Sequence, residues 1–309
     1  MTSAVKTHKN RNRIREPLCD RVFSAIVYFL LAIILILVMY PLYFVLVASF
    51  SDPTYVNSGT LLLYPKGFTM LGYERVFSDE RIWTGYGNTI LYTVCGTCIG
   101  LFATIMAGYA LSRKDLPGRN IFMGLMVFTM YFGGGLIPFY MVVKSLGLVN
   151  TRMALVLMGS VSVYNIIIVR SFFTSTLPQE LQEAAFIDGC GNTRYFFSIV
   201  VPLSQAIIAV IALYLAVGYW NAYFNAMIFI TDKDKFPLQI YLREILLTAK
   251  TAESTPVSGQ DAETAAMLEK MVEVVKYGVI VVSTLPIICV YPFLQKYFVK
   301  GVMIGAIKG

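Results

Sequence analysis

Two cysteines and one histidine are the residues whose types most directly suggest chemistry. Cys95 and Cys98 form a C-x-x-C pair, a spacing that suits a metal ion or a redox disulfide. Both lie in an apolar stretch with no second pair and no histidine nearby, so we interpret them as packing residues. His8 lies in a basic tail, and one histidine can build neither a His-based zinc site nor a Ser-His-Asp triad. We therefore expect this chain to contain no catalytic residue and no metal ligand.

The apolar residues come in blocks long enough to cross a lipid bilayer. The chain of 309 residues is 57% hydrophobic and 14% charged, whereas soluble proteins carry about 25% charged residues. This excludes a soluble enzyme, a disordered chain and a nucleic-acid-binding domain. A membrane-spanning helix needs about 20 mostly apolar residues, and lipid offers no partner to an open strand edge. We therefore predict an all-α membrane protein with six transmembrane helices, at 22–50, 88–111, 121–143, 153–169, 198–230 and 273–295.

The basic residues predict the orientation of these spans. With both termini in the cytoplasm, the tails 1–21 and 296–309 and the loops 112–120 and 170–197 hold 14 Lys and Arg in 72 positions. The opposite segments hold 10 in 88 positions. Short cytoplasmic segments are normally enriched in Lys and Arg, so this arrangement is favoured. The first apolar run is too long for a signal peptide, so we expect it to be a membrane anchor.

Charged groups are almost absent from the predicted spans. Only Glu273 and Lys276 occur, both at the edge of the last span. Proton-driven carriers usually depend on ionisable groups buried at membrane depth, so this class is disfavoured. A sodium-driven carrier that uses backbone carbonyls and hydroxyls stays open. No G-x-x-x-x-G-K-[ST] motif is present, so the chain has no P-loop of its own for ATP.

The cytoplasmic loop 170–197 contains the signals of a short helix at about 178–188. Pro178 suits the first turn of a helix, and Glu180 places negative charge near the N-terminal end of the helix dipole. Gly189 can adopt the left-handed conformation that ends a helix, and Asn192 or Thr193 can cap the next one. A short helix held between two membrane spans would act as a lever if a partner gripped it.

The same loop resembles a known family. Glu183-Ala184-Ala185, Gly189 and Ile199-Val200-Val201-Pro202 reproduce the spacing of the EAA signature of ABC importer permeases, EAA-x3-G-x9-I-x-L-P. The one departure is Val201, where the family usually has leucine. The C-terminal segment 295–309 and the stretches 132–138, 154–173, 219–229 and 236–246 are similar to MalG-like permeases of the carbohydrate-uptake class, in the branch for complex oligosaccharides and polysaccharide fragments.

The resemblance implies a fold, partners and a coupling site. The fold would be that of a type I importer permease (MetI/MalG-like) in the bacterial cytoplasmic membrane. The partners would be a second, MalF-like permease, a dimer of ATPase subunits, an extracytoplasmic sugar-binding protein and membrane lipid. ATP and Mg²⁺ would bind to the ATPase, and this chain would bind no cofactor and catalyse no reaction. The residues implied to couple the chain to the ATPase are Glu183, Ala184, Ala185, Asp188 and Gly189.

A sugar path calls for aromatic faces and amides rather than ions, because sugars have hydroxyls and apolar ring faces. The three glycines at 133–135 suggest a helix break that faces a cavity. The alternative is that the aromatic residues mark membrane interfaces and the glycines only let helices pack closely. The candidate path residues are Tyr131, Tyr164, Asn165, Tyr219, Trp220, Asn221, Tyr223 and Asn225.

The outer loop 231–272 has two parts. Residues 236–246 are apolar enough for a short helix on the membrane face, and the remainder reads as a flexible excursion. This loop or 51–87 could contact a sugar-binding protein, or could be a plain connector. The alternative function for the whole chain is a stand-alone facilitator or an ion-gradient-driven sugar carrier.

Overall fold

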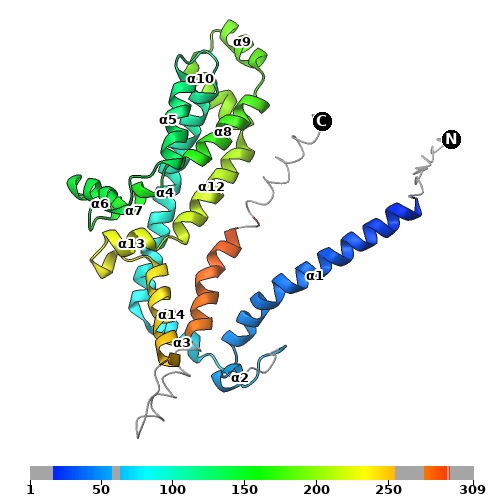
Figure 1. Ribbon diagram of the computed structural model, residues 1–309, viewed down its shortest axis with the longest axis vertical. Coiled ribbons are helices and arrows are strands. Elements are labelled where there is room, and N and C mark those ends of the chain that lie inside the picture. Colours follow the sequence, from blue (N-terminus) through cyan, green and yellow to red (C-terminus); the bar gives the residue numbers. More distant parts are fainter. Residues whose placement is uncertain (1–16, 58–62, 255–274, 291, 293–309) are drawn as a thin grey trace, which may run out of the picture.

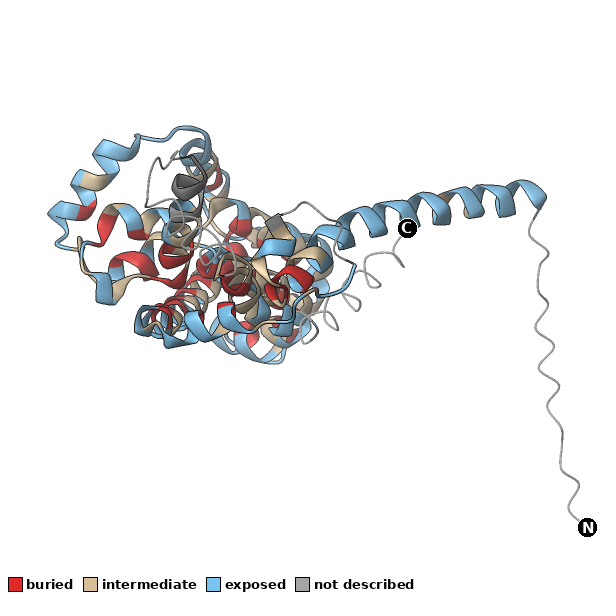
Figure 2. Cartoon of the chain, turned by 90° about the horizontal axis from the view of Figure 1, so that it is seen from below, coloured by how far each residue is buried: buried red, intermediate tan, exposed pale blue. Residues whose placement is uncertain are grey.

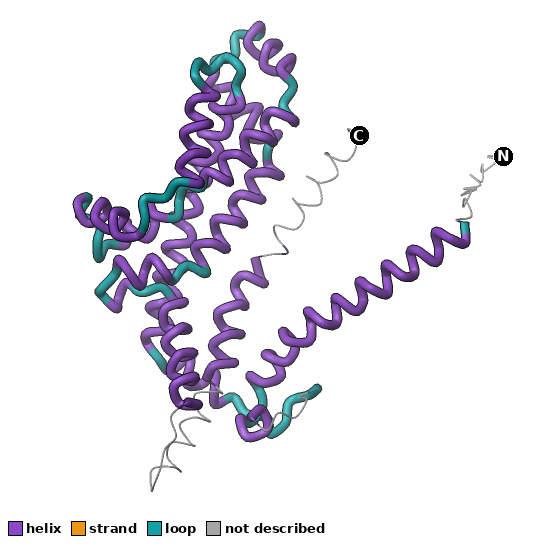
Figure 3. Tube along the Cα trace, in the orientation of Figure 1, coloured by secondary structure: helices purple, strands orange, loops and turns teal. Residues whose placement is uncertain are grey.

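The computed structural model describes residues 17–57, 63–254, 275–290 and 292, with the side chains of 248–254 left aside. Every regular element in these ranges is a helix and none is a strand (Figure 3). The predicted all-α class is therefore confirmed for the part of the chain that the structure describes. The tails 1–16 and 293–309 and the loop 255–274 lie outside it.

The first helix stands apart from the remainder of the protein. α1 (Leu18–Ser49) extends away from the helical bundle (Figure 1). Its buried residues are confined to its C-terminal end, at Val47, Ala48 and Ser49. Most apolar side chains along the rest of α1 are exposed within the chain (Figure 2). Lipid or another subunit must therefore cover this helix, because so long an apolar surface is not stable in water.

The central helix of the bundle is α4 (Glu80–Ser112), and it packs against α8, α12 and α14. Asp79 begins this helix by accepting a hydrogen bond from the Arg81 N–H. Glycines on α4 let the neighbouring helices approach closely: a Cβ on Gly100 would lie 2.3 Å from the Ser160 carbonyl oxygen. A Cβ on Gly108 would lie 2.5 Å from a methyl of Val169. Small residues serve this purpose in many membrane helices.

Three of the predicted spans are bent pairs of helices. α5 (Arg119–Tyr131) and α6 (Leu136–Ser145) meet at 115°, so the prediction of one span over 121–143 is incomplete. α7 (Arg152–Met158) and α8 (Val163–Thr176) meet at 45°. The segment Asn192–Leu203 and α12 (Gln205–Trp220) meet at 80°.

The number of membrane crossings is consequently less simple than six straight helices. Among the described residues, two helices, α1 and α4, are long and apolar enough to span a bilayer, and up to five spans result if each bent pair counts as one. A shorter apolar helix, Val275–Val290, lies where the sixth span is predicted. The fourth span is predicted to end at residue 169, but α8 continues to Thr176, because its apolar face that packs on α4 extends to Phe173.

Short helices connect these elements. They are α2 (Pro53–Asn57), α3 (Leu71–Ser78), α9 (Gln179–Ile187), α10 (Asn192–Tyr195), a π-helical turn (Phe196–Val200), α11 (Val201–Leu203), α13 (Phe224–Phe229) and a 3₁₀ turn (Lys233–Lys235).

The last described helix before the gap, α14 (Leu238–Ser254), packs along α4 (Figure 1). Leu238, Tyr241 and Leu242 are buried there. The Thr89 hydroxyl accepts a hydrogen bond from the Leu238 N–H at 2.9 Å. The helix over 236–246 is thus confirmed, but it belongs to the packed bundle and continues into the segment expected to be flexible.

Candidate substrate cavity and coupling helix

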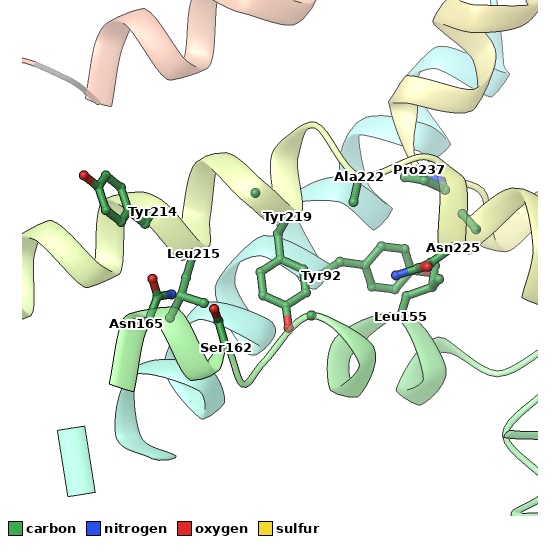
Figure 4. A pocket seen from close by; sticks show the side chains of 13 residues that line it. Tyr92, Leu155, Ser162, Asn165, Tyr214, Leu215, Tyr219, Ala222, Asn225 and Pro237 are labelled. Carbon is green, nitrogen blue, oxygen red and sulfur yellow. The ribbon is translucent and has the colours of Figure 1, made fainter. Parts of the chain in front are cut away.

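A cavity of about 310 Å³ lies between α4, α7, α8, α12 and α13 (Figure 4). None of the side chains that line it is charged. The lining residues are Tyr92, Leu155, Gly159, Ser162, Asn165, Tyr214, Leu215, Gly218, Tyr219, Ala222, Asn225, Ala226 and Pro237.

Four polar side chains of this cavity have no hydrogen-bond partner among the described residues. Asn165 is the most informative, because the residue is only 7% exposed, its side-chain amide makes no hydrogen bond within the described chain, and its polar atoms are not among the fully enclosed ones. Ser162, Tyr214 and Asn225 also line the cavity without a side-chain partner there. Of these four residues only Asn165 is buried, Ser162 and Asn225 are half-buried and Tyr214 is exposed, and buried polar groups are nearly always paired. The cavity therefore suits a neutral ligand that offers several hydroxyl groups.

Tyr219 forms one wall of the cavity and is fixed in place. Its hydroxyl donates a hydrogen bond to the Val156 carbonyl oxygen. Its ring lies against Gly96 and Gly159, and a Cβ on Gly96 would come within 2.2 Å of the ring. These contacts join α12 to α4 and α7, so Tyr219 positions the wall as well as lining the space.

Three of the eight predicted path residues, Asn165, Tyr219 and Asn225, line the cavity. Trp220 is buried, and its indole N–H donates to the Ser283 carbonyl oxygen at 3.0 Å, so it packs α12 against the helix 275–290. The other four, Tyr131, Tyr164, Asn221 and Tyr223, are exposed and do not line the cavity. The glycines 133–135 do break a helix, but they do not face this cavity.

The lining residues Tyr92, Ser162 and Tyr214 are absent from the predicted set. A usable signal existed for one of them. Tyr214, Gly218, Ala222 and Asn225 are spaced at four, four and three residues, which is one face of a helix.

The candidate coupling helix, α9, lies at the end of the bundle opposite α14 (Figure 1). Its observed bounds, Gln179–Ile187, confirm the helix predicted at about 178–188. Gly189 has φ +76°, the left-handed conformation expected at the helix end. The expected cap of the next helix is wrong: Gly191 precedes α10, and no side chain caps it. The Asn192 side chain instead accepts a hydrogen bond from Arg113.

The two alanines of α9 face different surroundings. Ala185 is 7% exposed and packs in the core with Tyr195 and Phe196, whereas Ala184 is exposed. The expectation that both alanines form a surface for a partner therefore applies to Ala184 alone. Glu183, Asp188 and Gly189 are exposed, and so is Ile187, at 86%.

Arg113, in the loop after α4, holds α9 to the bundle. Its guanidinium donates to Asp115 at 2.8 Å and to the Asn192 side chain at 3.0 Å. It also lies 5.4 Å from the centre of the Phe186 ring, on α9. The hydrogen bond from Arg113 lowers the pKa of the Asp115 carboxyl, so this ion pair is present at neutral pH. The neighbouring Lys114 donates to Gln179 at 3.0 Å, at the start of α9.

Replacing Arg113 by alanine should loosen α9. The variant loses the bond to Asn192 and the contact with Phe186, and charged hydrogen bonds contribute about 1.5–3 kcal/mol each before solvent screening. We expect amide hydrogen exchange over 179–188 to become roughly tenfold faster. The matched control is Arg194→Ala, which removes an exposed arginine on α10. Equal acceleration in both variants would show that Arg113 does not hold the helix.

The family described as "Binding-protein-dependent transport system inner membrane component" matches residues 96–304. This chain belongs to that family. The matched region includes residues 96–112 of α4, every lining residue of the cavity except Tyr92, and α9, so nearly all of both candidate sites lies in the part that the family shares. The family implies a partner permease, an ATPase and a binding protein alongside this membrane permease.

Individual relatives agree with this assignment. Protein LplC of Bacillus subtilis is 41% identical over 269 residues, which is 87% of this chain and 89% of LplC. The polygalacturonan/rhamnogalacturonan transport system permease protein YtcP of Bacillus subtilis is 39% identical over 290 residues, 94% of this chain and 99% of YtcP. A crystal structure of a bacterial ABC transporter that imports the acidic polysaccharide alginate contains a chain with 33% identity and a TM-score of 0.79. The match covers 92% of this chain and 99% of that one.

Proposed function

We propose that this chain is a permease subunit of an ATP-driven importer and forms half of the path for an oligosaccharide or a fragment of a polysaccharide. The uncharged cavity with unpartnered hydroxyl and amide groups carries this proposal. The names of two relatives support it, since one refers to polygalacturonan and rhamnogalacturonan and the imported alginate is also a polysaccharide. We further propose six membrane crossings with both termini in the cytoplasm.

The cavity can accept only part of such a ligand. Sites for small molecules commonly have about 300–1,000 Å³, so this cavity is at the lower limit. Asn165 and Asn225 can each donate to and accept from sugar hydroxyls. The ring of Tyr214 offers an apolar face for the C–H groups of a sugar ring. The second permease would then complete the path on the open side.

The exposed surface of α9 suits the second part of the proposed function, which is coupling of the permease to the ATPase. Glu183, Ala184 and Asp188 are exposed, as is Ile187, so this end of α9 can enter a groove on an ATPase subunit. The opposite face is fixed by Ala185 in the core. In this proposal ATP and Mg²⁺ act on the ATPase, α9 moves with it, and the bundle shifts between two packings that open to opposite sides.

Reconstitution distinguishes this proposal from a stand-alone carrier. We expect the tagged chain, purified in mild detergent, to bring with it a second permease and an ATPase. In liposomes that contain the complex and the binding protein, uptake of labelled oligosaccharide should require ATP. Uptake by this chain alone in ATP-free liposomes would favour the facilitator or ion-gradient carrier instead.

A further inference from the structure

Arg243, on α14, packs its guanidinium against a tyrosine in the segment that borders one end of the cavity. Its Cζ lies 4.8 Å from the centre of the Tyr223 ring. Tyr223 lies between α12 and α13, and its near neighbours in sequence, Ala222 and Asn225, both line the cavity. Together with Pro237 these two residues form the end of the cavity opposite Tyr214 and Asn165 (Figure 4). Neither Arg243 nor Tyr223 lines the cavity, so the guanidinium contacts the segment 222–225 from outside the cavity.

No carboxylate pairs with Arg243 among the described residues. The ion pairs that the structure shows there are Arg81–Asp79, Arg113–Asp115 and Lys235–Asp232. Arg243 is half-buried, and the ring of Tyr223 covers one face of its guanidinium. Stacking on an aromatic ring leaves the N–H groups at the guanidinium edge available in a fixed fork. A half-buried cation arranged in this way suits a planar anion such as a carboxylate.

The side-chain amides of Gln239 and Asn221 belong to the same two segments as Arg243 and Tyr223. Gln239 is one helical turn before Arg243 on α14, and its Nε2 donates to the Asn221 side-chain oxygen at 3.5 Å. Asn221 follows α12, so this contact joins the same two segments as the contact between Arg243 and Tyr223. We define these four residues, Asn221, Tyr223, Gln239 and Arg243, as the rim cluster.

We propose that the rim cluster binds the carboxylate of an acidic sugar, a uronate residue, as the oligosaccharide enters the cavity. This inference rests on the proposed function. Arg243 would bind the carboxylate through two parallel N–H groups, and Gln239 and Asn221 would bind neighbouring hydroxyls. None of the described residues that line the cavity is charged, so an ionic contact with the carboxylate of a uronate has to come from a residue outside the cavity.

The test is binding of trigalacturonate to the transporter complex without its binding protein, measured by calorimetry in lipid nanodiscs. Its neutral counterpart, trigalactose, is the second probe. Arg243→Gln should weaken trigalacturonate binding about tenfold to 100-fold and leave trigalactose binding unchanged. Arg243→Lys should recover part of the loss, because it restores the charge but not the fork. Lys233→Gln, which removes an exposed cation from the adjoining 3₁₀ turn, is the matched control and should change neither.

Several outcomes would overturn the inference. If Lys233→Gln weakened trigalacturonate binding as much as Arg243→Gln does, the effect would come from the overall positive charge of the surface. If Arg243→Gln weakened trigalactose binding as much as trigalacturonate binding, Arg243 would have a packing role. If the Arg243→Gln complex bound both sugars normally but its ATPase were no longer stimulated by the binding protein, Arg243 would instead contact that protein. A wild-type complex that transports neutral oligosaccharides but does not bind trigalacturonate would refute the rim cluster and leave the proposed function intact. Absence of any ATP-driven uptake would refute the proposed function itself.

Discussion

Glu183→Lys should abolish ATP-driven uptake by the assembled transporter while the chain remains folded and inserted. Glu183 is exposed on α9, and its contact within the described chain is one hydrogen bond from Gln179, at 3.0 Å. Its loss should therefore hardly affect the bundle. At a docking surface, however, a reversed charge costs several kcal/mol, so we expect uptake to fall by at least about 30-fold. The measurement is uptake of labelled oligosaccharide into proteoliposomes, with ATP hydrolysis recorded in parallel.

Controls separate docking from general charge effects. Thr174→Lys adds a positive charge at the same end of the bundle, on α8 instead of α9, and should retain most of the uptake. Glu183→Gln removes the charge without reversing it and should give an intermediate loss. Co-purification of the ATPase with each variant reports docking directly. Full uptake and a normally bound ATPase in the Glu183→Lys complex would show that α9 does not transmit the motion.

The helix α9 could be predicted because its signals are local. Pro178 immediately before the first turn and Gly189 at the end are conformational preferences of single residues, and the structure shows both in these positions. The face that α9 turns inward could not be predicted in the same way. Ala185 is buried because Tyr195 and Phe196 pack over it, and Arg113 reaches α9 from a different loop. These contacts depend on tertiary structure, which residue spacing along one helix does not contain.

The membrane spans illustrate the same limit. Length and apolarity predicted where apolar helices occur, because the bilayer requires both. Length and apolarity alone gave one span over 121–143; the glycines 133–135 indicated a break within it, but neither its 115° angle nor the direction in which it faces. The candidate path residues were chosen by type, and aromatic residues serve equally well in packing. Trp220 has an aromatic ring and an N–H group that could bind a sugar, but its N–H donates to the Ser283 carbonyl oxygen and packs α12 against the helix 275–290.

Gly100→Ala should destabilise the bundle strongly, although it adds only one methyl group. The added Cβ would lie 2.3 Å from the carbonyl oxygen of Ser160, a backbone atom at the bend between α7 and α8. A flexible side chain could move away, but this carbonyl can move only if the bend moves with it. Overpacking of this kind costs about 1–3 kcal/mol or more, and exceeds the roughly 1 kcal/mol that alanine gains over glycine in a helix.

The matched variant is Gly87→Ala, in the same helix, where an added Cβ meets no atom within 4 Å. This change should leave the melting temperature in detergent unchanged or raise it, whereas Gly100→Ala should lower it clearly. Because Gly159 and Ser162 adjoin Ser160 and line the cavity, Gly100→Ala should also reduce uptake by the protein that remains folded. Equal melting temperatures for the two variants would mean that α4 and the α7–α8 bend are not in close contact, and that the cavity between them has a different shape.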